Sequence, residues 1–239
     1  MTSSKDIKSN ITRRVFLKLF GAGAFLLSLP STLWSFVLDI FPVRTVEKET
    51  FRFNPDSGNI VWDGEKEETY KLTLDGLIQE PVNLTYNDLK SLPQTEQVSD
   101  FHCVEGWSVE DIKWGGFKFE EILNKVSIKP EAKFAVFHSL GETRSSPEGQ
   151  EHYIESFPIS ELLDPEKELL LVLNMGGEPL SHDHGAPLRL IAPYDLAYKS
   201  IKFIQRIEFT DKVQPGWWTL ASSFYPVDAP VPEHRLRQK

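Results

Sequence analysis

Short runs in which apolar and polar residues alternate recur along the chain between residues 41 and 77. In the clearest run, Tyr70, Leu72 and Leu74 share one face of an extended segment and polar residues occupy the other face. Successive side chains of a β-strand point to opposite faces, so this pattern predicts half-buried strands. The continuous apolar run at residues 169–173 predicts a strand that is buried on both faces. The chain is therefore limited to folds that contain many short strands.

Short helices and turns are expected between these strands. Residues 85–88 read Thr-Tyr-Asn-Asp, which is typical of a capping box and predicts a helix that ends before Pro93. Apolar residues at helical spacing predict a second helix over residues 119–126. A proline and a glycine predict a tight turn at residues 54–58. Further strands are expected over residues 97–102 and 132–137. We therefore expect one β-rich α+β domain with mixed sheets and short helices.

The first 40 residues differ from the rest of the chain. Arg13 and Arg14 precede Val-Phe-Leu-Lys and then an apolar run over residues 19–40. A basic segment before an apolar one is typical of an export signal, and the paired arginines resemble the signal that the twin-arginine translocase reads. The apolar run also approaches the ~20 residues that span a membrane, so an uncleaved anchor is the alternative. We expect three parts: a signal or anchor over residues 1–40, a domain over 41–218, and an irregular tail over 219–239 that packs on the domain.

Charge and cysteine content exclude several functions. The formal net charge of −9 argues against a nucleic-acid partner, which would need clustered Lys and Arg side chains to replace counterions. The chain has one cysteine, Cys103, so it forms no internal disulfide. One cysteine also excludes an all-cysteine zinc site, an iron–sulfur cluster and a c-type haem attachment, which each need at least two. Any metal centre must therefore use other ligands beside a single sulfur.

Cys103 lies in the segment Cys-Val-Glu-Gly-Trp-Ser, which Trp-Gly-Gly follows at residues 114–116. A lone cysteine is usually a buried and inert side chain. The neighbours of Cys103 are polar, aromatic or glycine, however, and a core strand would be continuously apolar. The sequence therefore predicts that Cys103 lies at a strand end or in a loop.

Two alternatives use Cys103 without another cofactor. A zinc site would combine it with His102, His182 and His184, but that site would have to coexist with the start of the strand that follows. A cysteine hydrolase would pair Cys103 with His102 or His138, but no residue is evident to orient the histidine. Both alternatives explain fewer of the motifs than the resemblance that follows.

A second motif reads His-Gly-Ala-Pro-Leu-Arg over residues 184–189, and Lys-Ser-Ile-Lys follows at 199–202. Together with the cysteine motif, in this order and spacing, the chain from about Val43 to Trp218 resembles the molybdopterin-binding domain of the sulfite oxidase family. The resemblance is strongest to bacterial members related to the protein-methionine-sulfoxide reductase catalytic subunit. It implies a sulfite-oxidase-type fold with a Mo-molybdopterin cofactor.

The resemblance also implies roles for individual residues. Cys103 would be the single protein thiolate ligand of molybdenum, whose other sulfur ligands come from the pterin. Five matching positions are expected to hold the pterin and its phosphate: His184, Arg189, Ser200, Ile201 and Lys202. His138 is expected as a further cofactor contact, and Glu105 is expected to orient the reacting groups beside the metal. Arg144, in the polar loop at 141–149, is a candidate for binding an anionic or S-oxide substrate.

These expectations describe a periplasmic molybdoenzyme, exported in folded form, that transfers an oxygen atom to or from a small-molecule or protein substrate of the sulfite or S-oxide type. Because the chain lacks cysteines for iron–sulfur clusters and a c-type haem motif, electrons would pass to or from a separate haem-containing partner. The alternative is a molybdopterin-binding or scaffold subunit without turnover. His184 stands where methionine-sulfoxide reductases commonly have Asn, so sulfite-type and S-oxide-type substrates both stay open.

Overall fold

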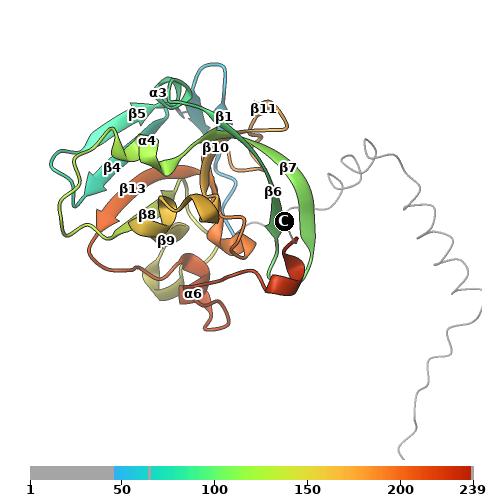
Figure 1. Ribbon diagram of the computed structural model, residues 1–239. Helices are drawn as coiled ribbons and strands as arrows, with labels where there is room; N and C mark the ends of the chain where they lie inside the picture. Colours follow the sequence, from blue (N-terminus) through green and yellow to red (C-terminus); the bar gives the residue numbers. More distant parts are fainter. Residues whose placement is uncertain (1–45, 64–65, 238–239) are drawn as a thin grey trace, which may run out of the picture. The chain divides into compact units, whose positions relative to one another are not determined.

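The computed structural model describes residues 46–63 and 66–237, which all belong to the second of two units of the chain, Thr45–Lys239. Figure 1 shows them as curved sheets with short helices between the strands. Three sheets and four short α-helices make up this part of the chain, which confirms the β-rich α+β class. The α-helices are α3 (Tyr86–Lys90), α4 (Phe119–Leu123), α5 (Ile159–Leu162) and α6 (Trp217–Ala221).

The first large sheet has five strands and is mixed. In spatial order they are β5 (Val82–Thr85), β4 (Lys71–Gly76), β13 (Ile204–Thr210), β8 (Phe134–Ser139) and β9 (Ile154–Pro158). Strand β13 runs parallel to β4 and antiparallel to β8. Leu72 and Leu74 of β4 are fully buried and Lys71 is exposed, which confirms the predicted alternation.

The second large sheet carries the cysteine. It contains β6 (Thr95–His102), β7 (Ser108–Phe117), β10 (Leu170–Met175), β11 (Glu178–Pro179) and β12 (Arg189–Ile191). Strands β6 and β7 form a long curved hairpin (Figure 1). Cys103 lies in its turn, after the last pair of the ladder, His102 and Ser108. A Cβ atom at Gly116 of β7 would lie 2.0 Å from the carbonyl oxygen of Leu171 on β10, so glycine permits the close approach of these strands.

The two large sheets share one hydrophobic core. Its fully buried members include Leu74, Phe137 and Phe209 from the first sheet and Phe117 and Leu171 from the second. Each such side chain contributes about 1.5–3 kcal/mol when it leaves water. A smaller cluster that contains Leu170, Val172 and Trp114 packs on the other face of β10. Strand β10 is therefore buried on both faces, which confirms the prediction for the apolar run at residues 169–173.

The local signals of the sequence hold with small changes in length. The hydroxyl oxygen of Thr85 accepts a hydrogen bond from the N–H of Asp88 (3.2 Å) and the carboxylate of Asp88 accepts one from the N–H of Thr85 (2.8 Å), so the capping box of α3 is confirmed. Helix α4 ends at Leu123, three residues earlier than expected. The turn at residues 54–58 joins two strands of the third sheet, which contains β1 (Phe51–Asn54), β2 (Asn59–Trp62) and β3 (Lys66–Thr69).

The chain after α6 crosses the domain with little regular structure. Ala229 and Val231 of this segment are buried, and their backbone bonds with Leu196 and Tyr194 are both 2.8 Å long. No helix within residues 46–63 and 66–237 has the length and apolar character needed to cross a membrane. The signal or anchor expected over residues 1–40 lies outside the described residues.

Candidate functional site

Cys103 lies at the tip of the β6–β7 hairpin. Its N–H donates to the carbonyl oxygen of Trp107 (2.9 Å), and its own carbonyl oxygen accepts from the N–H of Gly106 (3.1 Å). Gly106 has a φ of +97°, a region that residues with side chains rarely adopt, which explains the glycine of this motif. The side chain of Cys103 is only partly buried, so this sulfur is not part of the hydrophobic core.

The surroundings of Cys103 do not favour a free nucleophile. Partial burial raises the pKa of the thiol above its ordinary value, and the opposing effects of nearby N–H groups and of Arg235 are smaller. A cysteine nucleophile needs a lowered pKa. His102 lies on the opposite face of the strand, where its Nδ1 atom is 2.7 Å from the hydroxyl oxygen of Ser108. A bound metal deprotonates a coordinating thiol directly, so the site fits a metal ligand better than a hydrolase nucleophile.

Arg189 is a buried cation without a carboxylate partner. Arg189 is the first residue of β12 and is 5% exposed. No Asp or Glu of the described residues lies within ion-pair distance of its guanidinium. The guanidinium donates to the carbonyl oxygens of His184 (3.0 Å) and Ser200 (3.5 Å). Burial lowers the pKa of Arg189 to about 10. An anion bound beside this group would offset the cost of burying its charge.

Lys202 lies close to Arg189 in the same region. Its Nζ atom donates to the carbonyl oxygen of Asp183 (3.4 Å) and lies 4.9 Å from the ring centre of Phe203. Burial lowers the pKa of Lys202, and the positive charge of Arg189 acts in the same direction. A Cβ atom at Gly185 would lie 2.8 Å from the Lys202 side chain, so the glycine of the second motif lets its loop pass close to this lysine.

The other three residues of the second motif have different surroundings. The Nδ1 atom of His184 lies 2.8 Å from the hydroxyl oxygen of Ser181, and its side chain is partly exposed. The hydroxyl oxygen of Ser200 accepts from the N–H of Ala192 (3.0 Å), so it supports the loop backbone. Ile201 is buried in the hydrophobic core, and its N–H and carbonyl groups both bond within the chain. Any cofactor contact of Ser200 and Ile201 stays a prediction.

Arg189 packs against the hairpin that carries Cys103. The guanidinium carbon of Arg189 lies 5.5 Å from the ring centre of Phe101 and 5.3 Å from that of Trp114. Phe101 belongs to β6 and Trp114 to β7, and Cys103 follows Phe101 by two residues in the turn between these strands. The structure thus connects the two sequence motifs through an aromatic residue of each strand of the hairpin.

Three buried nitrogen atoms near these residues have no hydrogen-bond partner in the described part of the chain. They are Nε of Arg189, Nε1 of Trp114 and Nδ1 of His182. An unsatisfied buried polar group costs about 1–3 kcal/mol. Together with the cation of Lys202, these atoms fit an anionic ligand that is rich in hydrogen-bond acceptors, such as a pterin with a phosphate group.

Two residues of this region were not among the predicted cofactor contacts. His182 was considered only for zinc, although it adjoins the second motif; its ring packs between those of Phe51 and Phe203, with centres 5.2 and 5.0 Å away. Arg52, on β1, lies 3.0 Å from His182 through its Nη1 atom. No local signal marks Arg52, since it is 130 positions away from His182. The zinc alternative gains no support, because within residues 46–63 and 66–237 no three His, Cys, Asp or Glu side chains are arranged to hold a metal ion.

Arg144 and Glu105 lie on the surface. The N–H and Nε of Arg144 donate to the carbonyl oxygens of Val46 (2.8 Å) and Glu47 (3.4 Å), and the Glu47 carboxylate acts on the pKa values of Arg189 and Lys202. Arg144 is therefore hydrogen-bonded to the segment that carries Glu47, the carboxylate whose charge acts on Arg189 and Lys202. Glu105 is exposed beside Cys103, and its carboxylate accepts from Nε1 of Trp107 (3.3 Å).

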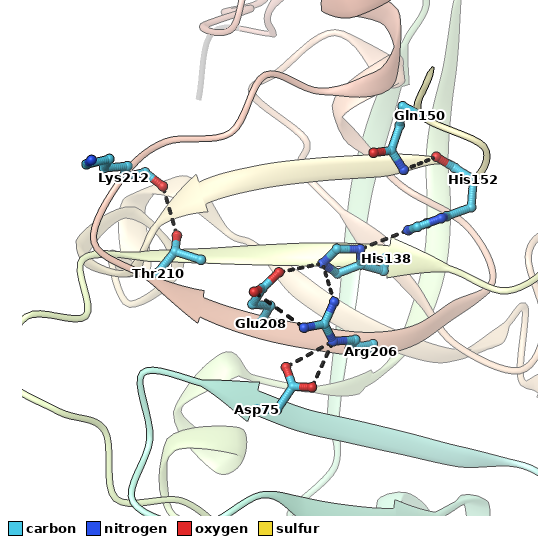
Figure 2. A network of polar contacts seen from close by, with 8 residues as sticks. All are labelled: Asp75, His138, Gln150, His152, Arg206, Glu208, Thr210 and Lys212. Atoms are coloured by element: carbon cyan, nitrogen blue, oxygen red, sulfur yellow. Dashed lines mark hydrogen bonds and ion pairs between the residues drawn. The ribbon is translucent and has the colours of Figure 1, made fainter. Parts of the chain in front are cut away.

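His138 belongs to a different polar group, which Figure 2 shows. Its Nδ1 lies 2.9 Å from Nε2 of His152, and its Nε2 lies 3.2 Å from the carboxylate of Glu208. Arg206 joins this group and bonds both carboxylate oxygens of Asp75 at 3.0 and 2.8 Å. The structure shows no contact between His138 and the residues around Cys103 or Arg189, so its role as a cofactor contact stays a prediction.

The chain is similar to several characterised and uncharacterised bacterial proteins. It is 33% identical over 149 residues to the uncharacterized oxidoreductase YuiH of Bacillus subtilis, a match that covers 62% of this chain and 69% of YuiH. It is 32% identical to the protein-methionine-sulfoxide reductase catalytic subunit MsrP of Campylobacter jejuni, covering 89% of this chain and 78% of MsrP. The match to MsrP of Ralstonia nicotianae, 33% identical, covers 69% of this chain and only 52% of that protein.

A solved structure and a family model agree on the fold. The sulfane dehydrogenase SoxCD of Paracoccus pantotrophus matches with a TM-score of 0.53 and 18% identity, over 88% of this chain and 56% of that one. The model of the oxidoreductase molybdopterin binding domain matches residues 59–218, which span both motifs. The sulfite-oxidase-type fold expected from the sequence is therefore confirmed, and the chain belongs to the sulfite oxidase family of molybdopterin oxidoreductases.

Proposed function

We propose that this chain is a molybdoenzyme that binds Mo-molybdopterin and transfers an oxygen atom to or from a sulfur centre. The observation that carries the proposal is the buried cation of Arg189, which has no carboxylate partner among the described residues and packs against Phe101, two residues before Cys103. An anionic cofactor with a phosphate at one end and a metal at the other would offer a counterion to Arg189 and a metal to the thiolate of Cys103. When bound, the cofactor supplies the two-electron chemistry, and the protein binds and orients it.

The residues divide the work of binding. Cys103 offers one thiolate at the tip of the hairpin, where its partial exposure leaves room for a metal and a substrate. Arg189 and Lys202 offer two cations for the phosphate, and the unpaired nitrogens of His182 and Trp114 offer hydrogen bonds to the pterin. His184 is placed by Ser181 at the partly exposed edge of the same region.

The substrate class follows from the exposed residues near Cys103. Trp107 is 49% exposed and Glu105 is exposed, so a substrate that approaches the cysteine meets an aromatic ring and a carboxylate. A thioether S-oxide is neutral and suits this surface better than the sulfite anion, which Glu105 would repel. The MsrP relatives are named for a sulfoxide substrate, which supports this choice. Arg144 is the candidate contact for a larger or charged part of the substrate.

Electrons would come from outside the chain. Its one cysteine excludes an iron–sulfur cluster and a c-type haem attachment, so a separate haem-containing carrier is the natural donor or acceptor. The paired arginines at positions 13 and 14 support export of the loaded protein to the periplasm by the twin-arginine translocase, either with cleavage or with an anchor.

The deciding experiment measures molybdenum and pterin in protein exported from a host that loads a control molybdoenzyme. We expect about one molybdenum per chain, with turnover of a methionine S-oxide by a reduced viologen donor. Sulfite with ferricyanide is the matched assay for the opposite direction. Absence of metal and pterin from the wild-type chain would reject the proposal. A loaded chain that turns over neither substrate would instead point to a non-catalytic binding subunit.

A further inference from the structure

The C-terminal segment lies across the cysteine hairpin. Its short helical turn η4 (Glu233–Arg235), drawn in red in Figure 1, lies beside the turn between β6 and β7. Arg235 donates from Nη1 to the carbonyl oxygen of Cys103 (2.9 Å) and from Nη2 to that of Trp107 (2.7 Å). Nη2 also lies 3.1 Å from the hydroxyl oxygen of Ser108. We call residues 233–237 the C-terminal strap.

The strap is held at both of its ends. Upstream, Val231 is buried and donates its N–H to the carbonyl oxygen of Tyr194 (2.8 Å). Downstream, Arg237 pairs with Asp100 of β6 and, at 2.9 Å, with Asp111 of β7. Because Val231 and Arg237 fix the chain on both sides of Arg235, the guanidinium of Arg235 reaches the hairpin turn from a defined direction.

Arg235 binds the backbone that determines where the Cys103 sulfur lies. The turn itself has only two backbone hydrogen bonds, and residues 105–108 are exposed, so such a tip opens easily. One planar guanidinium closes the turn by binding the carbonyl groups of both Cys103 and Trp107. When these groups are fixed, the direction of the Cα–Cβ bond of Cys103 is fixed, and Sγ is restricted to a few rotamers.

We propose that Arg235 is a positioning residue for Cys103, and that the C-terminal strap holds the cysteine turn in the conformation in which its sulfur meets the metal. This rests on the proposed function, because a metal ligand requires such placement. Arg235 does not itself touch the reacting atoms. Groups that orient a ligand from outside commonly change metal affinity or activity about 10- to 100-fold when they are removed.

The test uses the full chain with Arg235→Gln, which removes the charge and the paired donors, and Arg235→Lys, which keeps the charge alone. Glu233→Gln is the matched control, because Glu233 is exposed on the same helical turn. Hydrogen exchange of the amides at residues 103–107 is measured in cofactor-free and loaded protein. The loaded protein is also assayed for kcat, KM and the electron paramagnetic resonance spectrum of molybdenum.

For Arg235→Gln we expect amide exchange about 10-fold faster in the turn, kcat reduced about 10- to 100-fold with KM little changed, and an altered molybdenum spectrum. Arg235→Lys should lie between, and the Glu233→Gln control should match the wild type. Unchanged exchange in the turn, or faster exchange with unchanged kcat and spectrum, would overturn the proposal.

Failure of the proposed function would look different. If the wild-type chain loads no molybdenum, that function is rejected, and hydrogen exchange of the cofactor-free protein still decides whether Arg235 orders the turn. If Arg235→Gln does not fold, Arg235→Lys decides by the same readouts: a lower kcat with faster exchange in the turn supports the positioning role, and wild-type values contradict it.

Discussion

Two groups of polar side chains, the partly buried network around His138 and the buried set around Arg189, differ in how far the described residues satisfy them. In the network of Figure 2, His138 bonds His152 and Glu208, and Arg206 bonds Asp75 through two hydrogen bonds. Around Arg189, three buried nitrogen atoms lack acceptors within the described residues. Since unsatisfied buried polar groups are costly, the second arrangement is favourable only with a ligand. Around Arg189 it is the absence of partners among the described residues, rather than burial alone, that indicates a ligand.

The two arginines express this difference most directly. Burial acts to lower the pKa of Arg206, but Asp75 and Glu208 together raise it above the ordinary value. For Arg189 burial prevails, and its pKa falls to about 10 despite a smaller opposing effect of Glu47. Arg206 is therefore a structural cation with one counterion, Asp75, on the neighbouring strand β4 and another, Glu208, on its own strand. Arg189 is a cation whose counterion the described part of the chain does not provide.

The largest effect is expected at Cys103, in the turn of the hairpin against which Arg189 packs. Cys103→Ser should abolish turnover of the loaded enzyme, because a hydroxyl is a poor replacement for a soft thiolate ligand. Its free energy of unfolding should change by less than about 0.5 kcal/mol, since the side chain is only partly buried. Turnover assays and urea unfolding measure the two quantities. Retained turnover would remove Cys103 from the metal site.

The comparison itself is tested next, by Arg189→Met. In cofactor-free protein this change should raise the free energy of unfolding by about 1–3 kcal/mol, because it removes an unpaired buried charge and leaves an apolar side chain of similar length. The same variant should fail to retain the pterin. Urea unfolding measures the gain in stability of the cofactor-free protein, and cofactor analysis measures the loss of pterin. Destabilisation of the cofactor-free protein would mean that the charge is satisfied by the chain after all.

Arg206→Met is the matched change in the other group. Here we expect a loss of about 1 kcal/mol, because Asp75 and Glu208 lose their cation but are partly exposed to water. Pterin content and kcat should stay at wild-type levels, since no hydrogen bond or ion pair among residues 46–63 and 66–237 connects this network with Cys103. Loss of cofactor from this variant, measured beside Arg189→Met, would contradict the division of the two groups.

Local patterns account for the parts of the structure that were predicted correctly. The capping box of α3 and the double burial of β10 depend on neighbours a few residues away, which the sequence displays directly. The motif around Arg189 was identified by its resemblance to a family and by its position after Gly-Ala-Pro. Periodicity alone would have assigned this arginine to an exposed strand face, as it does for most charged residues.

Long-range partners account for what the sequence did not reveal. His138 lies in strand β8, one residue beyond the strand expected from the sequence, but its partners Glu208 and Arg206 lie 70 and 68 residues away and no local rule predicts them. Arg235 lies in a tail expected only to pack on the domain, 132 residues from the carbonyl group it binds. Such contacts follow from the path of the chain, which strand patterns leave open.

The smallest expected effect is a pH dependence of stability that arises from His138, in the network whose polar groups have partners. Burial, with the charge of Arg206 and the neighbouring His152, lowers the pKa of His138 from 6.5 to about 3. Below about pH 6.5 the unfolded chain therefore binds a proton at His138 that the folded chain does not bind. The contribution of His138 to the free energy of unfolding is fully present above this pH and decreases as the pH falls towards 3. Between pH 7.5 and 6.0 the wild-type chain loses about 0.8 kcal/mol of stability through this group.

His138→Gln keeps a hydrogen-bonding side chain but cannot titrate, so its loss of stability over this interval should be smaller than that of the wild type by this amount. Urea unfolding of both proteins at the two pH values measures the difference. Equal losses would mean that the folded and unfolded chains bind this proton equally well, and a smaller loss in the wild type would mean that Glu208 holds a protonated His138 as an ion pair.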